Sequence, residues 1–297
     1  MLRQRVVTAL VLLAVLLPTI FWWPAWTWAA LTLAFLSVGA REWAGLLAIV
    51  AARAAGSEPA AGGAGPARRV GRVAWPTALG VLAIGVVLLA WRWLAGWPAW
   101  LALSVSAAAA AWWCLAGPAR LRAHRAEGGG AALAAGLLLA CWIALIELHA
   151  MGPAVLLVAM AIVWIADIAA YFVGRAIGRR KLAPRISPGK SWEGAAGGAL
   201  AVVAAAWAVS ALADGGPLAA SLPARLFDTL GPALAVPLFV GLAALSVVGD
   251  LHESLLKREA GVKDSGTLLP GHGGVLDRID ALIPVMPAAL LLHRLAG

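Results

Sequence analysis

Charged residues are scarce in this sequence. They make up 12% of its 297 residues, whereas hydrophobic residues make up 63%. Soluble globular domains contain about 45 to 50% apolar residues and about 25% charged residues. The composition therefore excludes an ordinary soluble protein and predicts a polytopic membrane protein.

Cysteine is also scarce. The two cysteines, Cys114 and Cys141, lie inside hydrophobic runs, without Cys-x-x-Cys spacing or a histidine at a metal-binding interval. Isolated cysteines in such runs are typical of packed helices. The sequence therefore indicates neither a disulfide framework nor a zinc site.

A single basic surface is lacking too, although the net charge is +9. The basic residues form short clusters between hydrophobic runs, which argues against a nucleic-acid partner. Clusters of this kind suit anionic lipids and phosphate-bearing substrates. We also find no internal repeat with a fixed period.

Nine hydrophobic segments meet or approach the roughly 20 residues needed to cross a bilayer. We therefore predict an all-α fold, a polytopic bundle of about nine transmembrane helices. A cleaved signal peptide at the N-terminus is the less favoured alternative, because hydrophobic runs continue downstream. A short helix is also expected at Ala224–Thr229. The nine segments lie near residues 5–22, 25–48, 75–94, 98–116, 131–149, 153–175, 193–212, 232–249 and 279–296.

The loops between these segments differ in charge. If the N-terminus is cytoplasmic, most of the 23 basic residues fall on the cytoplasmic side, and Arg92, Arg225 and Arg294 fall on the other. This asymmetry follows the positive-inside tendency, and many tryptophans lie at segment ends as interfacial anchors. We predict a multi-pass membrane protein with a cytoplasmic N-terminus.

The densest polarity lies between residues 249 and 280, before and around the start of the last segment. If a helix continues to Arg258, then Asp250, Glu253 and Lys257 share one of its faces with Ser254. The acids that could bind a metal are Asp250, Glu253, Asp264, Asp277 and Asp280, and the fixed cations are Lys257, Arg258, Lys263 and Arg278.

This stretch also contains a Pro-Gly-His-Gly-Gly turn, whose glycines would let backbone N–H groups approach a phosphate. Carboxylates bind Mg²⁺, and Lys or Arg neutralise phosphate charge, so the composition predicts metal-assisted phosphate chemistry. The alternative is a solvated loop that only sets topology. A loop that only sets topology needs basic residues, but it does not need nearly as many acidic residues as this stretch contains.

A second polar cluster begins in the sixth segment. Asp167 interrupts a hydrophobic run and shares a helix face with Tyr171, Gly174 and Gly178, where the glycines would admit a neighbouring helix or a lipid. The turn at residues 187–191 precedes a helix expected from Trp192, whose N-terminus would suit an anion. The alternative is a capped, positively charged loop. Both clusters lie on the same predicted side, so we expect one pocket.

Both clusters resemble the phosphatidate cytidylyltransferases, the CDP-diacylglycerol synthases. The signature S-x-x-K-R-x4-K-D-x-G-x3-P-G-H-G-G-x-x-D-R-x-D is filled from Ser254 to Asp280. The pattern W-x-x-D-x-x-A-Y-x-x-G-R, followed by S-P-x-K-S/T-x-E-G, is filled from Trp164 to Gly194. The first 150 residues match the family only in hydropathy and number of segments.

The resemblance implies transfer of CMP from CTP to phosphatidic acid, with one or two Mg²⁺ ions, in a catalytic region at residues 151–297 that follows N-terminal helices at residues 1–150. The implied catalytic residues are Asp250, Asp277, Lys257, Arg258, Lys263 and Arg278. The implied metal ligands are Asp250, Asp277, Asp264 and Asp280. The implied substrate-binding residues are Ser187, Lys190, Ser191, Asp167, Tyr171, Arg175, Ser254, His272, Gly273 and Gly274. Among these, Ser187, Lys190 and Ser191 would bind the lipid phosphate.

Two alternatives remain open. One is another CTP-dependent lipid enzyme, such as a polyprenol kinase or an isoprenoid-lipid cytidylyltransferase. The other is an ion-coupled transporter, which is less favoured because the acids gather at one face. Two further acids are interpreted structurally: Glu42 as a partner of its neighbour Arg41, and Glu147 as a packing or dimer feature. A homodimer is compatible with the sequence.

Overall fold

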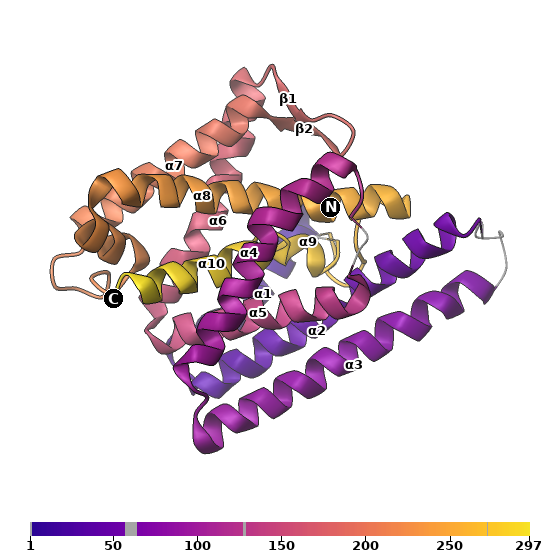
Figure 1. The fold of residues 1–297 in the computed structure, drawn as a ribbon, viewed down its shortest axis with the longest axis horizontal. Coiled ribbons are helices and arrows are strands. Elements are labelled where there is room, and N and C mark those ends of the chain that lie inside the picture. Colours follow the sequence, from indigo (N-terminus) through magenta and orange to yellow (C-terminus); the bar gives the residue numbers. More distant parts are fainter. Residues whose placement is uncertain (1, 57–63, 127–128, 272) are drawn as a thin grey trace. The chain divides into compact units, whose positions relative to one another are not determined.

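The computed structural model describes residues 2–56, 64–126, 129–271 and 273–297. The described residues form helices and one two-stranded antiparallel sheet (Figure 1). The predicted all-α fold is therefore confirmed apart from this hairpin. The helices are α1 (Leu2–Phe21), α2 (Ala25–Ala54), α3 (Ala64–Ala95), α4 (Ala99–Ala123), α5 (Gly130–Ala150), α6 (Pro153–Ile177), α7 (Trp192–Ala211), α8 (Leu222–Ala260), α9 (Leu276–Ile279) and α10 (Leu282–Leu295), and the strands are β1 (Lys181–Ala183) and β2 (Ser187–Ser191).

Within the described residues, seven helices are long and hydrophobic enough to cross a membrane, and they agree with seven of the nine predicted segments. These are α2, the part of α3 from Arg72 onwards, and α4 to α8. The first predicted segment corresponds to α1, in which Leu10–Phe21 is a shorter apolar helix. The last corresponds to α10, which has 14 residues. A helix of that length rises about 21 Å, less than the roughly 30 Å of a bilayer core. The total of nine spans and the side of the N-terminus stay predictions.

The chain forms two compact units. The first comprises Met1–Pro98, Arg120–Trp142 and His252–Asp280, and the second comprises Ala99–Ala119, Ile143–Leu251 and Ala281–Gly297. Helices α4, α5 and α8 therefore contribute residues to both units. The sequence predicts N-terminal helices up to residue 150 and a catalytic region from residue 151. That division concerns function and not compactness, and it stays a prediction.

The core of the first unit is built on α2, which packs along α3 (Figure 1). Trp28 and Leu33 of α2 are almost fully buried. The indole N–H of Trp142 donates to the Ala29 carbonyl at 2.9 Å, and the Thr32 hydroxyl donates to the Trp28 carbonyl at 2.7 Å. In an apolar environment polar groups must find partners within the protein. Helix α2 is therefore a well-anchored element, and it also contacts α9.

In the second unit, α6 and α7 approach each other closely through glycine. A Cβ atom on Gly198 would lie 2.7 Å from the Ala166 carbonyl oxygen, and one on Gly194 would lie 2.8 Å from the Ala170 carbonyl oxygen. A Cβ on Gly174 would meet the Gly194 Cα at 3.6 Å. Small residues allow such contact between membrane helices. The prediction that Gly174 admits a neighbouring helix is confirmed.

Helix α8 contains a sharp kink. Gly231 has φ 67° and ψ 170°, and Pro232 follows it. Glycine tolerates positive φ, and the residue before proline is steered away from helical ψ. The kink separates a first helical piece that begins at Leu222 from the long apolar piece. The first piece contains the predicted helix Ala224–Thr229, which is confirmed.

We predict that Gly198→Ala destabilises the second unit. The new methyl group would force the backbones of α6 and α7 apart, and overpacking of this kind costs about 1–3 kcal/mol. The matched control is Gly241→Ala, also within a helix of this unit, because a Cβ there meets nothing within 4 Å. Thermal unfolding in detergent should show a lower Tm for Gly198→Ala only. Equal Tm values for the two variants would contradict the packing described.

Candidate active site

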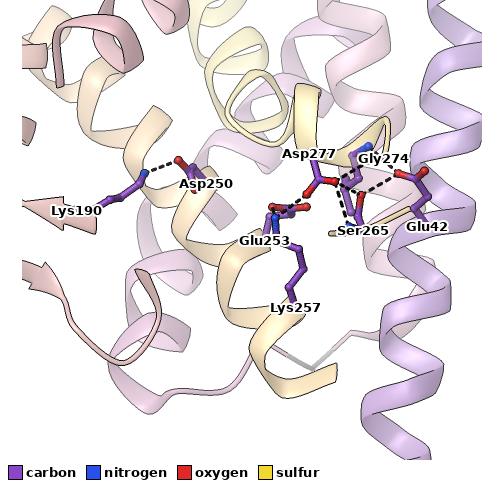
Figure 2. Close-up of polar contacts among 9 residues, drawn as sticks. Glu42, Lys190, Asp250, Glu253, Lys257, Ser265, Gly274 and Asp277 are labelled. Atoms are coloured by element: carbon purple, nitrogen blue, oxygen red, sulfur yellow. Dashed lines mark hydrogen bonds and ion pairs between the residues drawn. The ribbon is translucent and has the colours of Figure 1, made fainter. Parts of the chain in front are cut away.

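A largely buried lysine joins two carboxylates in the first unit (Figure 2). The Lys257 ammonium lies 2.5 Å from Glu253 Oε2 and 2.6 Å from Asp277 Oδ1. The three side chains are only 14%, 5% and 7% exposed, in that order. Glu253 and Lys257 face each other one turn apart at the end of α8, while Asp277 belongs to α9. One fixed cation thus serves two acids in a site largely shielded from solvent.

The second oxygen of Asp277 binds the loop that leads to α9. Asp277 Oδ2 accepts the Gly274 N–H at 2.8 Å and the Ser265 N–H at 3.1 Å, and the Ser265 hydroxyl lies 3.1 Å away. Burial raises the pKa of Asp277, but hydrogen bonds from Glu253, Lys257 and Gly274, together with the Lys257 charge, outweigh it and lower the pKa to about 2. Asp277 is therefore an anion near neutral pH.

Glycines in this loop make room for side chains. Gly273 has φ 84°, and a Cβ atom there would lie 2.8 Å from Asp277 Oδ2. A Cβ on Gly274 would lie 2.6 Å from Glu42 Oε2. The Gly274 N–H already donates to Asp277, so a phosphate could receive this N–H only if that bond were given up. The predicted role of Gly273 and Gly274 as phosphate donors stays a prediction.

The second unit contains a similar charge arrangement. Lys190 of β2 lies 2.5 Å from Asp250 Oδ2 of α8. Asp167 of α6 lies within electrostatic range of both residues. Sequence reasoning placed Asp167, Lys190 and Asp250 among the site residues, and the structure brings these three together. The prediction that both clusters form one pocket stays a prediction.

The turn predicted at residues 187–191 is strand β2, paired with β1 through Ala183 and Ser187. The helix expected from Trp192 begins there as α7, and Ser191 is its N-cap, accepting the Gly194 N–H at 3.1 Å. Glu193 accepts the N–H groups of Arg179 and Arg180. The capping interpretation of Ser191 is therefore confirmed, and its hydroxyl oxygen serves the helix.

Known proteins resemble the chain along its whole length. The sequence model of a family described as the cytidylyltransferase family matches residues 3–296. The phosphatidate cytidylyltransferase of Pseudomonas aeruginosa is 41% identical over 305 aligned residues, which cover 100% of this chain and 98% of that protein. The chain belongs to the cytidylyltransferase family.

Shorter matches to proteins of the same name have a higher percentage of identical residues. The phosphatidate cytidylyltransferase of Brucella suis is 53% identical over 133 residues, or 45% of this chain and 43% of that protein. The Bacillus subtilis protein of that name is 45% identical over 129 residues, or 43% of each chain. Membership of the cytidylyltransferase family confirms the resemblance drawn from the two motifs, while the roles of individual residues stay predictions.

In this cytidylyltransferase family member, the remaining predicted residues are divided between the two units. Asp280 is half-buried beside α9 and lies within electrostatic range of Glu253. In the second unit, the Arg175 guanidinium donates to the Tyr171 hydroxyl at 3.0 Å. His272 lies outside the described residues. The exposed predicted residues of the first unit are Arg258, Lys263, Asp264 and Arg278, and Ser254 is half-buried.

The donors suit Mg²⁺, because carboxylate oxygens are its preferred protein ligands and each cluster has more acids than lysines. Across residues 2–56, 64–126, 129–271 and 273–297, however, no three His, Cys, Asp or Glu side chains gather closely enough to hold a metal ion. Asp277 directs one oxygen to Lys257 and the other to the loop. The magnesium site therefore stays a prediction.

Sequence reasoning missed Ser265 of the loop, and it also missed Glu42 of α2. Glu42 is 5% exposed and accepts the Leu276 N–H at 2.8 Å, and its Oε2 lies 3.0 Å from the Ser265 hydroxyl. The pairing of Glu42 with Arg41 is wrong: the Arg41 guanidinium lies over the Trp75 ring, 4.7 Å from its centre. Adjacent helical residues do not face each other. An acid inside a hydrophobic segment was the signal that could have identified Glu42.

The other unassigned acid, Glu147, is paired within the chain. Its Oε2 accepts a hydrogen bond from Arg294 at 2.7 Å, and the Glu147 side chain is 8% exposed. Both residues belong to the second unit. This contact supports the packing interpretation of Glu147.

We predict that the stability given by Asp277 depends on acid pH. Because folding lowers its pKa from 3.8 to about 2, the contribution is complete above about pH 5 and is lost progressively as pH falls toward 2. A shift of this size corresponds to about 2 kcal/mol. In metal-free detergent buffer, Asp277→Asn should lower the Tm at pH 5, and this deficit should shrink at pH 3. Asp214 is an exposed acid, so Asp214→Asn serves as the control and should not lower the Tm at either pH. A deficit of equal size at both pH values would contradict the prediction.

Proposed function

We propose that this protein transfers CMP from CTP to phosphatidate, giving CDP-diacylglycerol and pyrophosphate. The observation that carries the proposal is the buried Lys257 network, which lies within the motif shared with phosphatidate cytidylyltransferases. The match to such a protein extends over 98% of that relative. The proposal includes the finer topology expected from the sequence: about nine spans, a cytoplasmic N-terminus, and a site on the cytoplasmic side of a bacterial inner membrane. No step requires a homodimer.

The reaction brings two polyanions together. A phosphate oxygen of phosphatidate attacks the α-phosphorus of CTP, and the bond from that phosphorus to the bridging oxygen breaks. Pyrophosphate leaves with the bonding electrons. A phosphate monoester has a second pKa of about 6. The attacking group is therefore already an anion near neutral pH and needs no protein base.

The protein's task is alignment and neutralisation of charge. Lys257 and the exposed cations of the same segment, Arg258, Lys263 and Arg278, would bind the triphosphate and the leaving pyrophosphate. Lys190, with Ser187 nearby on β2, would bind the lipid phosphate. His272 would position a phosphate or a carboxylate.

Magnesium would be held by Asp250 and Asp277, with Asp264 and Asp280 as further ligands, and when bound it would supply positive charge to the phosphates. The lysines that now neutralise these acids would then be free to bind phosphate. We expect EDTA to abolish activity and added Mg²⁺ to restore it. Full activity in EDTA would contradict the magnesium assignment.

The direct test supplies purified protein with CTP labelled in its cytidine and with a panel of lipid phosphates. We expect label to enter lipid only with phosphatidate, with one pyrophosphate released per lipid labelled. Release of CDP instead of pyrophosphate would indicate a lipid kinase, and preference for an isoprenoid phosphate would indicate a different cytidylyltransferase. Absence of any transfer from CTP would refute the proposal.

We predict that Asp277→Asn lowers kcat by about 10²- to 10³-fold, the loss typical of removing one electrostatic group from an active site. Asp214→Asn is the matched control, because Asp214 is an exposed acid of the other unit. The measurement is initial rate at saturating CTP and phosphatidate, in protein shown to be folded by size-exclusion chromatography. Activity of Asp277→Asn near that of the wild type would exclude Asp277 from the site.

We predict that Lys190→Ala raises the KM for phosphatidate by about tenfold or more, because a charge-assisted hydrogen bond contributes about 1.5–3 kcal/mol. The KM for CTP should change little. Arg185→Gln, an exposed cation of the same hairpin, is the control expected to leave both values unchanged. A rise in the KM for CTP alone would reverse the assignment of phosphate sites.

A further inference from the structure

Glu42 lies far from the motif in sequence but inside its hydrogen-bond network (Figure 2). Its Oε2 accepts the Leu276 N–H at 2.8 Å and lies 3.0 Å from the Ser265 hydroxyl. Leu276 begins α9 and precedes Asp277, while Ser265 bonds Asp277 directly. One Glu42 oxygen therefore contacts Ser265 and Leu276, the two ends of the loop that leads to Asp277.

The loop is shaped to receive this carboxylate. A Cβ on Gly274 would lie 2.6 Å from Glu42 Oε2, and one on Gly266 would lie 2.8 Å from the Glu42 side-chain carboxyl carbon. Real Cβ atoms essentially never lie within 3.0 Å of another heavy atom, so a side chain at either glycine would force the Glu42 carboxylate to move. Two glycines of the motif thus leave the space that Glu42 fills, which gives them a structural purpose apart from phosphate binding.

We propose that Glu42 is a positioning residue: by holding Ser265 and Leu276, it keeps the backbone next to Asp277 in the conformation that presents Asp277 to Lys257. Without Glu42, the Leu276 N–H would be a buried donor without an acceptor, and the Ser265 hydroxyl would lose one of its two neighbours. The loop would then rearrange, and Asp277 would leave its place beside Lys257. The effect on catalysis rests on the proposed function, whereas the effect on the loop does not.

The kinetic test compares Glu42→Ala with Glu42→Gln. Glutamine keeps an acceptor oxygen at the same reach, so it should retain kcat within about threefold, whereas alanine should lose about 10²-fold, the cost of misplacing a catalytic group by about 1 Å. The KM for CTP should change by less than about threefold in both. The matched control is Glu147→Gln. Glu147 is also a buried glutamate, and both it and its partner Arg294 belong to the second unit, so this variant should keep wild-type kcat.

The structural test measures hydrogen–deuterium exchange of the backbone amides. Glu42→Ala should raise exchange in peptides from residues 264–277 and leave peptides from residues 193–211 unchanged. Glu147→Gln should leave both regions unchanged. Faster exchange in both regions of Glu42→Ala would indicate general destabilisation and would overturn the proposal.

A double-mutant comparison of Glu42 and Ser265 provides a further test. Ser265→Ala and Glu42→Ala act on one network, so the double variant should lose much less kcat than the product of the two single losses. A loss equal to that product would overturn the proposal. If Glu42→Ala does not fold, Glu42→Asp replaces it, because its shorter side chain withdraws the acceptor and should lower kcat while Glu42→Gln does not.

Two further kinetic results would overturn the proposal. Equal losses in the alanine and glutamine variants would show that Glu42 acts through its charge and would overturn positioning. Wild-type kcat in the alanine variant would overturn it as well. A wild-type protein that transfers nothing from CTP would refute the proposed function, and the exchange comparison would still decide whether Glu42 orders the loop.

Discussion

The pair of contacts that Lys257 makes with Glu253 and Asp277 is the interaction on which the site depends. Removing a charge from water costs several kcal/mol, and breaking a buried pair costs about 3–5 kcal/mol because the remaining charge is uncompensated. The three side chains therefore constrain one another. Asp277 in turn holds the loop through Ser265 and Gly274, so the charge network and the backbone conformation are one system.

Lys190 repeats the arrangement in the second unit, where it contacts Asp250 and lies within electrostatic range of Asp167. In each unit a lysine therefore lies near two acids. A site of this kind has cations already fixed in place for phosphate and acids able to take a divalent ion. Groups fixed before the substrate arrives do not have to reorganise during the reaction, and this is the main way in which proteins stabilise developing charge.

The helices and the two motifs were predictable because their signals are local. Hydropathy located the apolar helices, and spacing placed Glu253 and Lys257 on one face of α8. Strand β2 was not predictable, since Ser187–Ser191 has no alternation of apolar and polar residues to indicate a strand. Glu42 was missed because its partners lie more than two hundred residues away in the sequence, while Arg41 stands beside it. The glycines were assigned to phosphate binding because sequence does not show that side chains fill the space beside them.

The most direct measurement follows the α and the γ phosphates of CTP separately. Wild-type protein and Asp277→Asn are supplied with phosphatidate and with CTP radiolabelled at either the α or the γ phosphate. We predict that the wild type places the α label in lipid and releases the γ label as pyrophosphate, and that Asp277→Asn labels almost no lipid. Lipid labelled from the γ phosphate, or α labelling undiminished in Asp277→Asn, would contradict this account.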